Sequence, residues 1–189
     1  MQTINIMIVG VGGQGTLLAS RILGKVAIKE GYDVKVSEVH GMSQRGGSVV
    51  TYVKYGDKVY SPIIDRGEAD LILAFEMLEA MRALPYLKKG GKMIANTQKM
   101  NPMPVITGAM EYPENIEEKL SAKINLQAVD ALSLAEKAGT IKAVNVVLIG
   151  LLAKSMDVDK NVWIDVIKET VPEKFLDVNI KAFELGYEL

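Results

Sequence analysis

Two glycine-rich segments hold the residue types in this sequence that could bind an anion. The first, Gly10-Val11-Gly12-Gly13-Gln14-Gly15, follows a short apolar run and precedes apolar residues at helical spacing. A strand, a Gly-x-Gly-x-x-Gly turn and a helix together let backbone N–H groups approach a phosphate at the helix N-terminus. The spacing therefore predicts a candidate binding turn, made of Gly10, Gly12, Gly13, Gln14, Gly15 and Thr16.

The same glycines also have a purely structural explanation. Glycine permits a tight turn and lets a helix pack closely on a strand without any ligand. Glu38, at the end of the next predicted strand, occupies roughly the place of a ribose-binding acid in dinucleotide sites. Gln14 is unusual in such a site, so contact with a partner or a substrate is an alternative role for it. A ligand-binding turn and a packing turn both remain open.

The second segment runs from His40 to Gly47 with the sequence HGMSQRGG. Paired glycines allow positive φ, so Arg45, Gly46 and Gly47 could form a nest of backbone amides that binds an anion. The planar guanidinium of Arg45 suits a carboxylate or a phosphate. Both glycine-rich segments follow strands at one sheet edge, so we expect them to lie close together. The candidate residues here are Ser43, Gln44, Arg45, Gly46 and Gly47, and contact with another subunit is the alternative.

The composition excludes several classes of function. The 189 residues fit one domain, residues 1–189, and the formal net charge of -1 gives no support for nucleic-acid binding. The sequence has no cysteine and one histidine, His40, so we expect no iron–sulfur cluster, no structural zinc site and no thiolate catalysis. We predict no catalytic residue, and His40 as a base is the weaker alternative to a structural role. Without a basic leader or a membrane-length apolar run, we expect a cytoplasmic protein.

Alternating strand and helix patterns predict the elements that position these segments. We expect a three-layer α/β/α fold with a mostly parallel sheet, an inserted β-hairpin and a helical C-terminal tail. The hairpin is expected to pair residues 48–55 with 58–61 across Gly56-Asp57. Residues 96–113, which hold three prolines, are expected to form a loop with at most one short strand. The other expected strands are 4–9, 33–39, 71–74, 92–95 and 124–129, and the expected helices are 16–30, 76–88, 114–120, 131–138, 144–156, 162–170 and 173–185.

Three further side chains have two interpretations each. Glu76 follows a predicted strand, where it could face a ligand or cap the next helix. Asn145 could hydrogen-bond the glycine-rich turn or cap its own helix. Trp163 could anchor an interface or fill the core.

Taken together, these motifs resemble one enzyme family. The Gly10–Gly15 turn, an Arg-Gly-Gly loop and the Ser-Val strand after it are similar to the gamma subunit or domain of 2-oxoacid:ferredoxin oxidoreductases. The run from Ser37 to Val49 resembles the beta subunit of the indolepyruvate type. The Gly-Pro-Glu-like sequence of the pyruvate and 2-oxoglutarate types is absent. The resemblance spans nearly the whole chain and includes Asn145 to Gly150 and Asn179 to Gly186.

The resemblance implies that this chain is one subunit of a complex whose subunits have different roles in the reaction. Such enzymes convert a 2-oxoacid and coenzyme A into acyl-CoA and carbon dioxide while they reduce ferredoxin, using thiamine diphosphate and iron–sulfur clusters. This chain is expected to bind none of these cofactors alone, and the sequence shows no Gly-Asp-Gly motif of a thiamine diphosphate site. The resemblance therefore implies a large partner subunit that carries them, with ferredoxin reached through the complex and a homodimer contact possible. A free-standing NAD(P)-binding enzyme and a nucleotide-binding scaffold are the alternatives.

Overall fold

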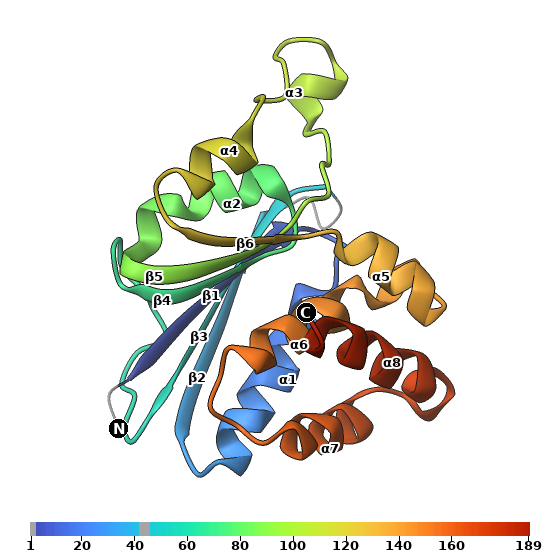
Figure 1. Ribbon diagram of the computed structural model, residues 1–189. Helices are drawn as coiled ribbons and strands as arrows, with labels where there is room; N and C mark the ends of the chain where they lie inside the picture. Colours follow the sequence, from blue (N-terminus) through green and yellow to red (C-terminus); the bar gives the residue numbers. More distant parts are fainter. Residues whose placement is uncertain (1–2, 42–45) are drawn as a thin grey trace.

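A computed structural model describes residues 3–41 and 46–189 of the chain. A six-stranded sheet forms its centre, with the strand order β2-β3-β1-β4-β5-β6 (Figure 1). Strands β1, β4, β5 and β6 pair in parallel, whereas β3 runs antiparallel between β1 and β2. The strands are β1 (Ile4–Val11), β2 (Asp33–His40), β3 (Ser48–Gly56), β4 (Ala69–Ala74), β5 (Leu87–Asn96) and β6 (Asn125–Val129).

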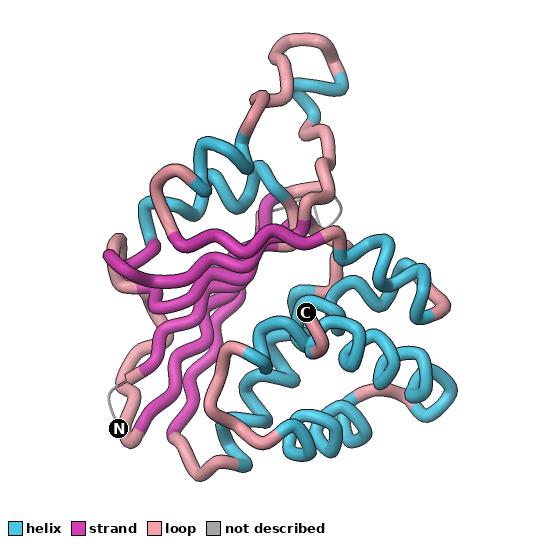
Figure 2. Tube along the Cα trace, viewed as in Figure 1, coloured by secondary structure: helices cyan, strands magenta, loops and turns pink. Residues whose placement is uncertain are grey.

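Helices cover the sheet on both faces, which confirms the expected three-layer α/β fold (Figure 2). One face carries α1 (Thr16–Lys29) and the C-terminal helices, and the other carries α2 and α4 (Figure 1). The remaining helices are α2 (Met77–Ala83), α3 (Met103–Ile106), α4 (Ile116–Ser121), α5 (Ala131–Ala138), α6 (Val144–Lys154), α7 (Lys160–Thr170) and α8 (Leu176–Tyr187).

Strand β1 shows why two cores form. Ile6 and Ile8 pack toward α1, α6 and α8, whereas Met7 and Val9 pack toward α2 and α4. Successive side chains of a strand point to opposite faces, so a strand covered on both faces must be apolar at every position. The unbroken apolar run that ends before Gly10 therefore belongs to a central strand.

The inserted hairpin is present, but its two arms differ from the prediction. β3 pairs with β2 on one side and with β1 on the other, so its two backbone edges are both used. Residues 58–61 do not form a strand in this structure. Instead the N–H of Val59 donates to Asp33 Oδ2 at 2.9 Å, which holds this segment across the start of β2. The predicted pairing of 48–55 with 58–61 is therefore wrong, and the hairpin is formed by β2 and β3.

Two other boundaries also differ from the sequence prediction. The helix expected over 76–88 ends at Ala83, and a 3₁₀ turn from Leu84 to Tyr86 contains Pro85. β5 then begins at Leu87, so Gly90 and Gly91 lie within a strand and do not end a helix. In the predicted loop 96–113, residues 103–106 form the short helix α3, and no strand is present.

The C-terminal helices contain the closest helix contact described in this structure. α6 is buried from Val144 to Ala153, and it meets α8 at two glycines. A Cβ atom added to Gly150 would lie 2.1 Å from the carbonyl oxygen of Phe183, and one added to Gly186 would lie 2.0 Å from that of Val147. Trp163 of α7 is fully buried and stacks on Phe183 at 6.4 Å, so it fills the core and is not an interface anchor.

Candidate functional site

The glycine-rich turn connects the end of β1 to the first turn of α1. Gly13 and Gly15 have φ values of 102° and 82°, a backbone region that favours glycine. A Cβ atom at Gly15 would also lie 2.5 Å from Nδ2 of Asn145. Asn145 donates to the carbonyl oxygen of Gly15 at 3.3 Å, which confirms the predicted bond to this turn. Close packing is therefore one established reason for glycine here.

Gln14 holds the shape of the turn with its side-chain amide. Its Oε1 accepts from the N–H of Val11 at 2.7 Å, and its Nε2 donates to the carbonyl oxygen of Phe75 at 3.1 Å. Gly10 is necessary for this arrangement because an added Cβ would lie 2.9 Å from Gln14 Oε1 and 3.0 Å from Phe75 Cβ. The turn is thus tied to the end of β4. Contact between Gln14 and a ligand or partner stays a prediction.

The two glycine-rich segments lie side by side, as the sequence predicts. The N–H of Gly12 donates to the carbonyl oxygen of Gly47 at 2.8 Å, and the N–H of Gly46 donates to that of Gly12 at 3.4 Å. Ser48 then donates to Oε2 of the buried Glu79 in α2 at 2.6 Å. Ser43, Gln44 and Arg45 lie outside the described residues. The chain from Gly46 to Ser48 is therefore anchored to the end of β1 and to α2.

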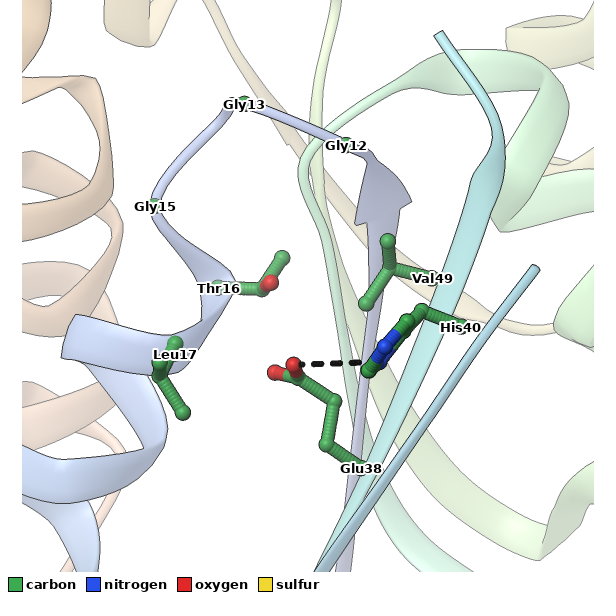
Figure 3. Close-up of a pocket in the computed structure, with 8 residues that line it drawn as sticks. All are labelled: Gly12, Gly13, Gly15, Thr16, Leu17, Glu38, His40 and Val49. Carbon is green, nitrogen blue, oxygen red and sulfur yellow. Dashed lines mark ion pairs between the residues drawn. The ribbon is translucent and has the colours of Figure 1, made fainter. Parts of the chain in front are cut away.

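A pocket of about 390 Å³ opens between the turn and the end of β2 (Figure 3). Glu38 and His40 project from β2 toward the start of α1, with 3.6 Å between Glu38 Oε1 and His40 Nδ1. Glu38 also accepts from Thr51 Oγ1 at 3.2 Å. The pocket combines a carboxylate, an imidazole and a helix start. It is lined by Gly12, Gly13, Gly15, Thr16, Leu17, Glu38, His40 and Val49.

Thr16 is a nearly buried polar residue of this pocket. The residue is only 6% exposed, and no hydrogen bond of its hydroxyl is found among the described residues; the hydroxyl oxygen itself is not one of the buried atoms without a partner, so it stays open to the pocket. The first turn of an α-helix leaves backbone N–H groups without intrahelical partners, and these carry partial positive charge. The hydroxyl and the helix start therefore offer donors to an anion at one place.

A second pocket of about 590 Å³ lies on the other side of the same turn. Its walls come from the turn, from the end of β5 and from the start of α6, and they are mainly apolar. The glycine-rich turn thus separates two cavities, so either could take part of one extended ligand. The second pocket is lined by Gly12, Gly13, Gln14, Gly15, Gly46, Gln98, Met100, Leu132, Ile141, Lys142 and Val144.

The strand order argues against a dinucleotide site of the usual kind. In that site the ribose-binding acid ends the strand next to β1. Here β3 lies between β1 and β2, so Glu38 is two strands away from the turn. The N–H of Gly12 is also occupied by Gly47, so it does not face a pyrophosphate group. The glycine spacing alone could not reveal this difference.

Sequence reasoning missed part of the polar network at this edge. The fully buried Asn96 donates to the carbonyl oxygen of Phe75 at 3.2 Å and accepts from the N–H of Ala131 at 3.2 Å. Glu76 caps α2 by accepting from the N–H of Glu79 at 2.9 Å, which confirms the capping interpretation. An asparagine at the end of an apolar strand was the available signal for Asn96, because a buried amide needs partners.

Tyr112 is bound to the same carboxylate. Its hydroxyl donates to Glu76 Oε1 at 2.5 Å, and burial together with this bond raises the pKa of Tyr112 above its ordinary value. Among the described residues, no group of three or more His, Cys, Asp or Glu side chains could hold a metal ion. Within the same part of the chain, no helix has the length and apolar character needed to cross a membrane.

Comparisons with known proteins find similarity along nearly the whole chain. A family model described as pyruvate ferredoxin/flavodoxin oxidoreductase matches residues 5–189. The indolepyruvate oxidoreductase subunit IorB of Thermococcus kodakarensis is 45% identical over 194 residues, which cover 98% of this chain and 95% of that protein. The gamma subunit of a keto/oxoacid ferredoxin oxidoreductase from Geobacter sulfurreducens has a similar structure, with a TM-score of 0.73, 25% identity and coverage of 98% and 96%.

A second similar structure contains this fold within a longer chain. The 2-oxoglutarate:ferredoxin oxidoreductase from Magnetococcus marinus, solved with 2-oxoglutarate, coenzyme A and succinyl-CoA bound, has a TM-score of 0.75 and 17% identity. The match covers 100% of the present chain and 31% of the Magnetococcus chain. At this identity the likeness concerns the fold alone.

Proposed function

Because the chain belongs to the pyruvate ferredoxin/flavodoxin oxidoreductase family, we propose that it is the small subunit of a 2-oxoacid:ferredoxin oxidoreductase of the indolepyruvate type. One observation carries the proposal, namely the 45% identity to IorB across 98% of this chain and 95% of that relative. The complex would decarboxylate an aryl 2-oxoacid oxidatively, form an acyl-CoA and reduce ferredoxin.

The cofactors of the reaction would reside on the larger partner subunit. Iron–sulfur clusters are held by cysteine thiolates, and this chain has no cysteine, so its donor set does not fit a cluster. Thiamine diphosphate would supply the carbanion chemistry on the same partner. We further propose that residues 1–189 act as one domain, that the complex works in the cytoplasm, and that ferredoxin meets it at the partner's clusters.

The part proposed for this chain is to bind a phosphate group of coenzyme A at the glycine-rich turn. The support comes from the hydroxyl of the nearly buried Thr16, which lies open to the pocket beside the N-terminus of α1. Gly13 and Gly15 keep side chains away from this place, and Glu38 would accept from a hydroxyl or amino group of the ligand. Ser43, Gln44 and Arg45, which lie outside the described residues, are proposed to contact the same ligand or the partner subunit.

Co-expression with the gene for the larger subunit tests the assembly. We expect a tagged form of this chain to co-purify with a cysteine-rich protein that contains thiamine diphosphate and iron. The pair should reduce ferredoxin with an aryl 2-oxoacid, and this chain alone should not. Turnover by this chain alone, or absence of any such partner, would refute the proposal.

A threonine pair tests the binding role within the active complex. Thr16→Val keeps the side-chain shape but removes the hydroxyl, so we expect the KM for coenzyme A to rise about tenfold, the value of one hydrogen bond to a charged group. The KM for the 2-oxoacid should not change. Thr3→Val is the matched control, because Thr3 directly precedes β1 and so lies at the opposite end of that strand from the turn. An unchanged KM for coenzyme A in Thr16→Val would contradict the binding role.

A further inference from the structure

Residues 100–112 form an excursion, here called the α3 excursion, that projects away from the sheet between β5 and α4 (Figures 1 and 2). Its sequence from Met100 to Met110 is MNPMPVITGAM, which has no charged side chain. Three of its large apolar side chains are exposed, since Met103, Ile106 and Met110 show 66%, 64% and 65% of their surface. Contiguous exposed apolar side chains of this kind mark interaction sites.

A single buried carboxylate oxygen holds both ends of the α3 excursion. Glu76 Oε1 accepts from the N–H of Met100 at 3.0 Å and from the hydroxyl of Tyr112 at 2.5 Å. Glu76 itself is only 1% exposed, and its other oxygen is bound to the N–H of Glu79. A buried carboxylate requires such partners. The excursion therefore begins and ends at one fixed point.

The tip of the α3 excursion is also ordered by its own backbone. The carbonyl oxygen of Pro104 accepts from the N–H groups of Ala109 and Met110 at 2.9 and 3.0 Å. Thr107 donates from both its N–H and its hydroxyl to the carbonyl oxygen of Met103. A segment that is shaped before binding loses less conformational entropy when it docks. The exposed side chains are thus presented on a preformed support.

The charges within and next to the α3 excursion indicate what kind of surface it can bind. Four exposed carboxylates lie within residues 100–118, at Glu111, Glu114, Glu117 and Glu118, and this stretch has no lysine or arginine; the flanking lysines are Lys99, Lys119 and Lys123. A symmetric contact between two copies through this tip would bring these carboxylates together, and like charges across an interface cost free energy. An anionic membrane surface is disfavoured for the same reason. The complementary surface is an apolar socket with a basic rim on a different chain.

We propose that the α3 excursion is the docking element that inserts into an apolar, basic-rimmed socket on the larger partner subunit. This inference rests on the proposed function, which requires such a subunit. Met103, Ile106 and Met110 enter the socket, the four carboxylates meet its rim, and Glu76 keeps the element closed. No residue of the excursion lines the pocket that holds Thr16 and Glu38, whereas Met100 lines the second pocket beside the turn.

A pair of isoleucine variants in the full complex tests the proposal. Ile106→Ser removes an apolar contact of the tip, and Ile28→Ser makes the same change in α1, on the opposite face of the sheet, at 62% exposure. In a titration of the larger subunit with this chain, we expect Ile106→Ser to raise the Kd at least about tenfold, as for an interface hot spot. Ile28→Ser should change it less than about twofold by the same scale.

Two further measurements separate the possible outcomes. Circular dichroism should show that both variants are folded, because both side chains lie on the surface. Charge reversal at Glu117 and Glu118 should weaken binding most at low salt, since screening removes the attraction at high salt. Equal affinity of Ile106→Ser and wild type would overturn the docking proposal alone. Failure of the wild-type chain to bind any larger subunit would instead refute the proposed function.

Discussion

Replacing Gly150 by alanine tests how closely α6 and α8 approach each other. In an ordinary helix interior this change stabilises by about 1 kcal/mol. Here the new Cβ atom would lie 2.1 Å from the carbonyl oxygen of Phe183, and the atom in the way belongs to the backbone. No side-chain rotation can relieve this contact, so the helices have to separate.

The expected size of the effect follows from these two contributions. Overpacking of a core costs about 1–3 kcal/mol, and a backbone clash belongs at the upper end. After subtraction of the gain in helix propensity, Gly150→Ala should lower the free energy of unfolding by about 2 kcal/mol. For a chain of this length, that corresponds to a fall in Tm of about 4–8 °C.

The single tryptophan of the chain provides the assay. Trp163 is fully buried and stacks on Phe183, so its fluorescence reports directly on this helix contact during denaturant unfolding. The matched control is Gly24→Ala in the middle of α1, where the nearest atom to an added Cβ, in Val36, lies at 3.6 Å. That control should gain up to about 1 kcal/mol. If Gly150→Ala were as stable as wild type, the inferred helix contact would be refuted.

Three other predictions concern the turn and the sheet. Gly15→Ala should destabilise the chain by at least about 1 kcal/mol in denaturant titrations, because φ is 82° and Asn145 Nδ2 lies 2.5 Å from the new atom; an unchanged midpoint would argue against the described turn. Gln14→Leu should cost about 1–3 kcal/mol because it leaves the N–H of Val11 unpaired, whereas the carbonyl oxygen of Phe75 keeps its bond from Asn96, and the same titration measures it. Burial raises the pKa of Tyr55 to about 12 from 10.0, so the folded state holds this proton more tightly than the unfolded state. Stability should therefore fall as pH rises from about 10 to 12, and Tyr55→Phe should fall less steeply over that window; parallel curves would contradict the assignment.

The sequence was most informative where one local signal determines one element. Apolar runs ended by glycine located β1 and α1, and the expected nearness of the two glycine-rich segments is confirmed by the bond between Gly12 and Gly47. The sequence did not show which two strands form the hairpin. Alternation marks residues 48–55 as a strand, but only tertiary structure shows that β1 and β2 both pair with it.

The candidate site was also predictable only in part from the sequence. Of the two interpretations of Asn145, the bond to the turn 130 residues away is the one that the structure confirms. The glycine spacing of the turn is that of a dinucleotide site. However, β3 lies between β1 and β2, so Glu38 is two strands away from the turn and not on the strand next to β1. The polar contacts of Asn96 and Glu79 join residues that are far apart in the chain, so no local pattern predicts them.

Because both ends of the α3 excursion are bound to Glu76 Oε1, the sequence between these ends can be replaced by another. Tyr112 also packs against the core beside α2, but among the described residues no hydrogen bond joins the eleven residues between Met100 and Tyr112 to the sheet. Insertions, deletions or a transplanted sequence could be accepted there while the rest of the molecule keeps its shape. Proteins with this arrangement could bind different partner proteins through sequence changes confined to this short segment.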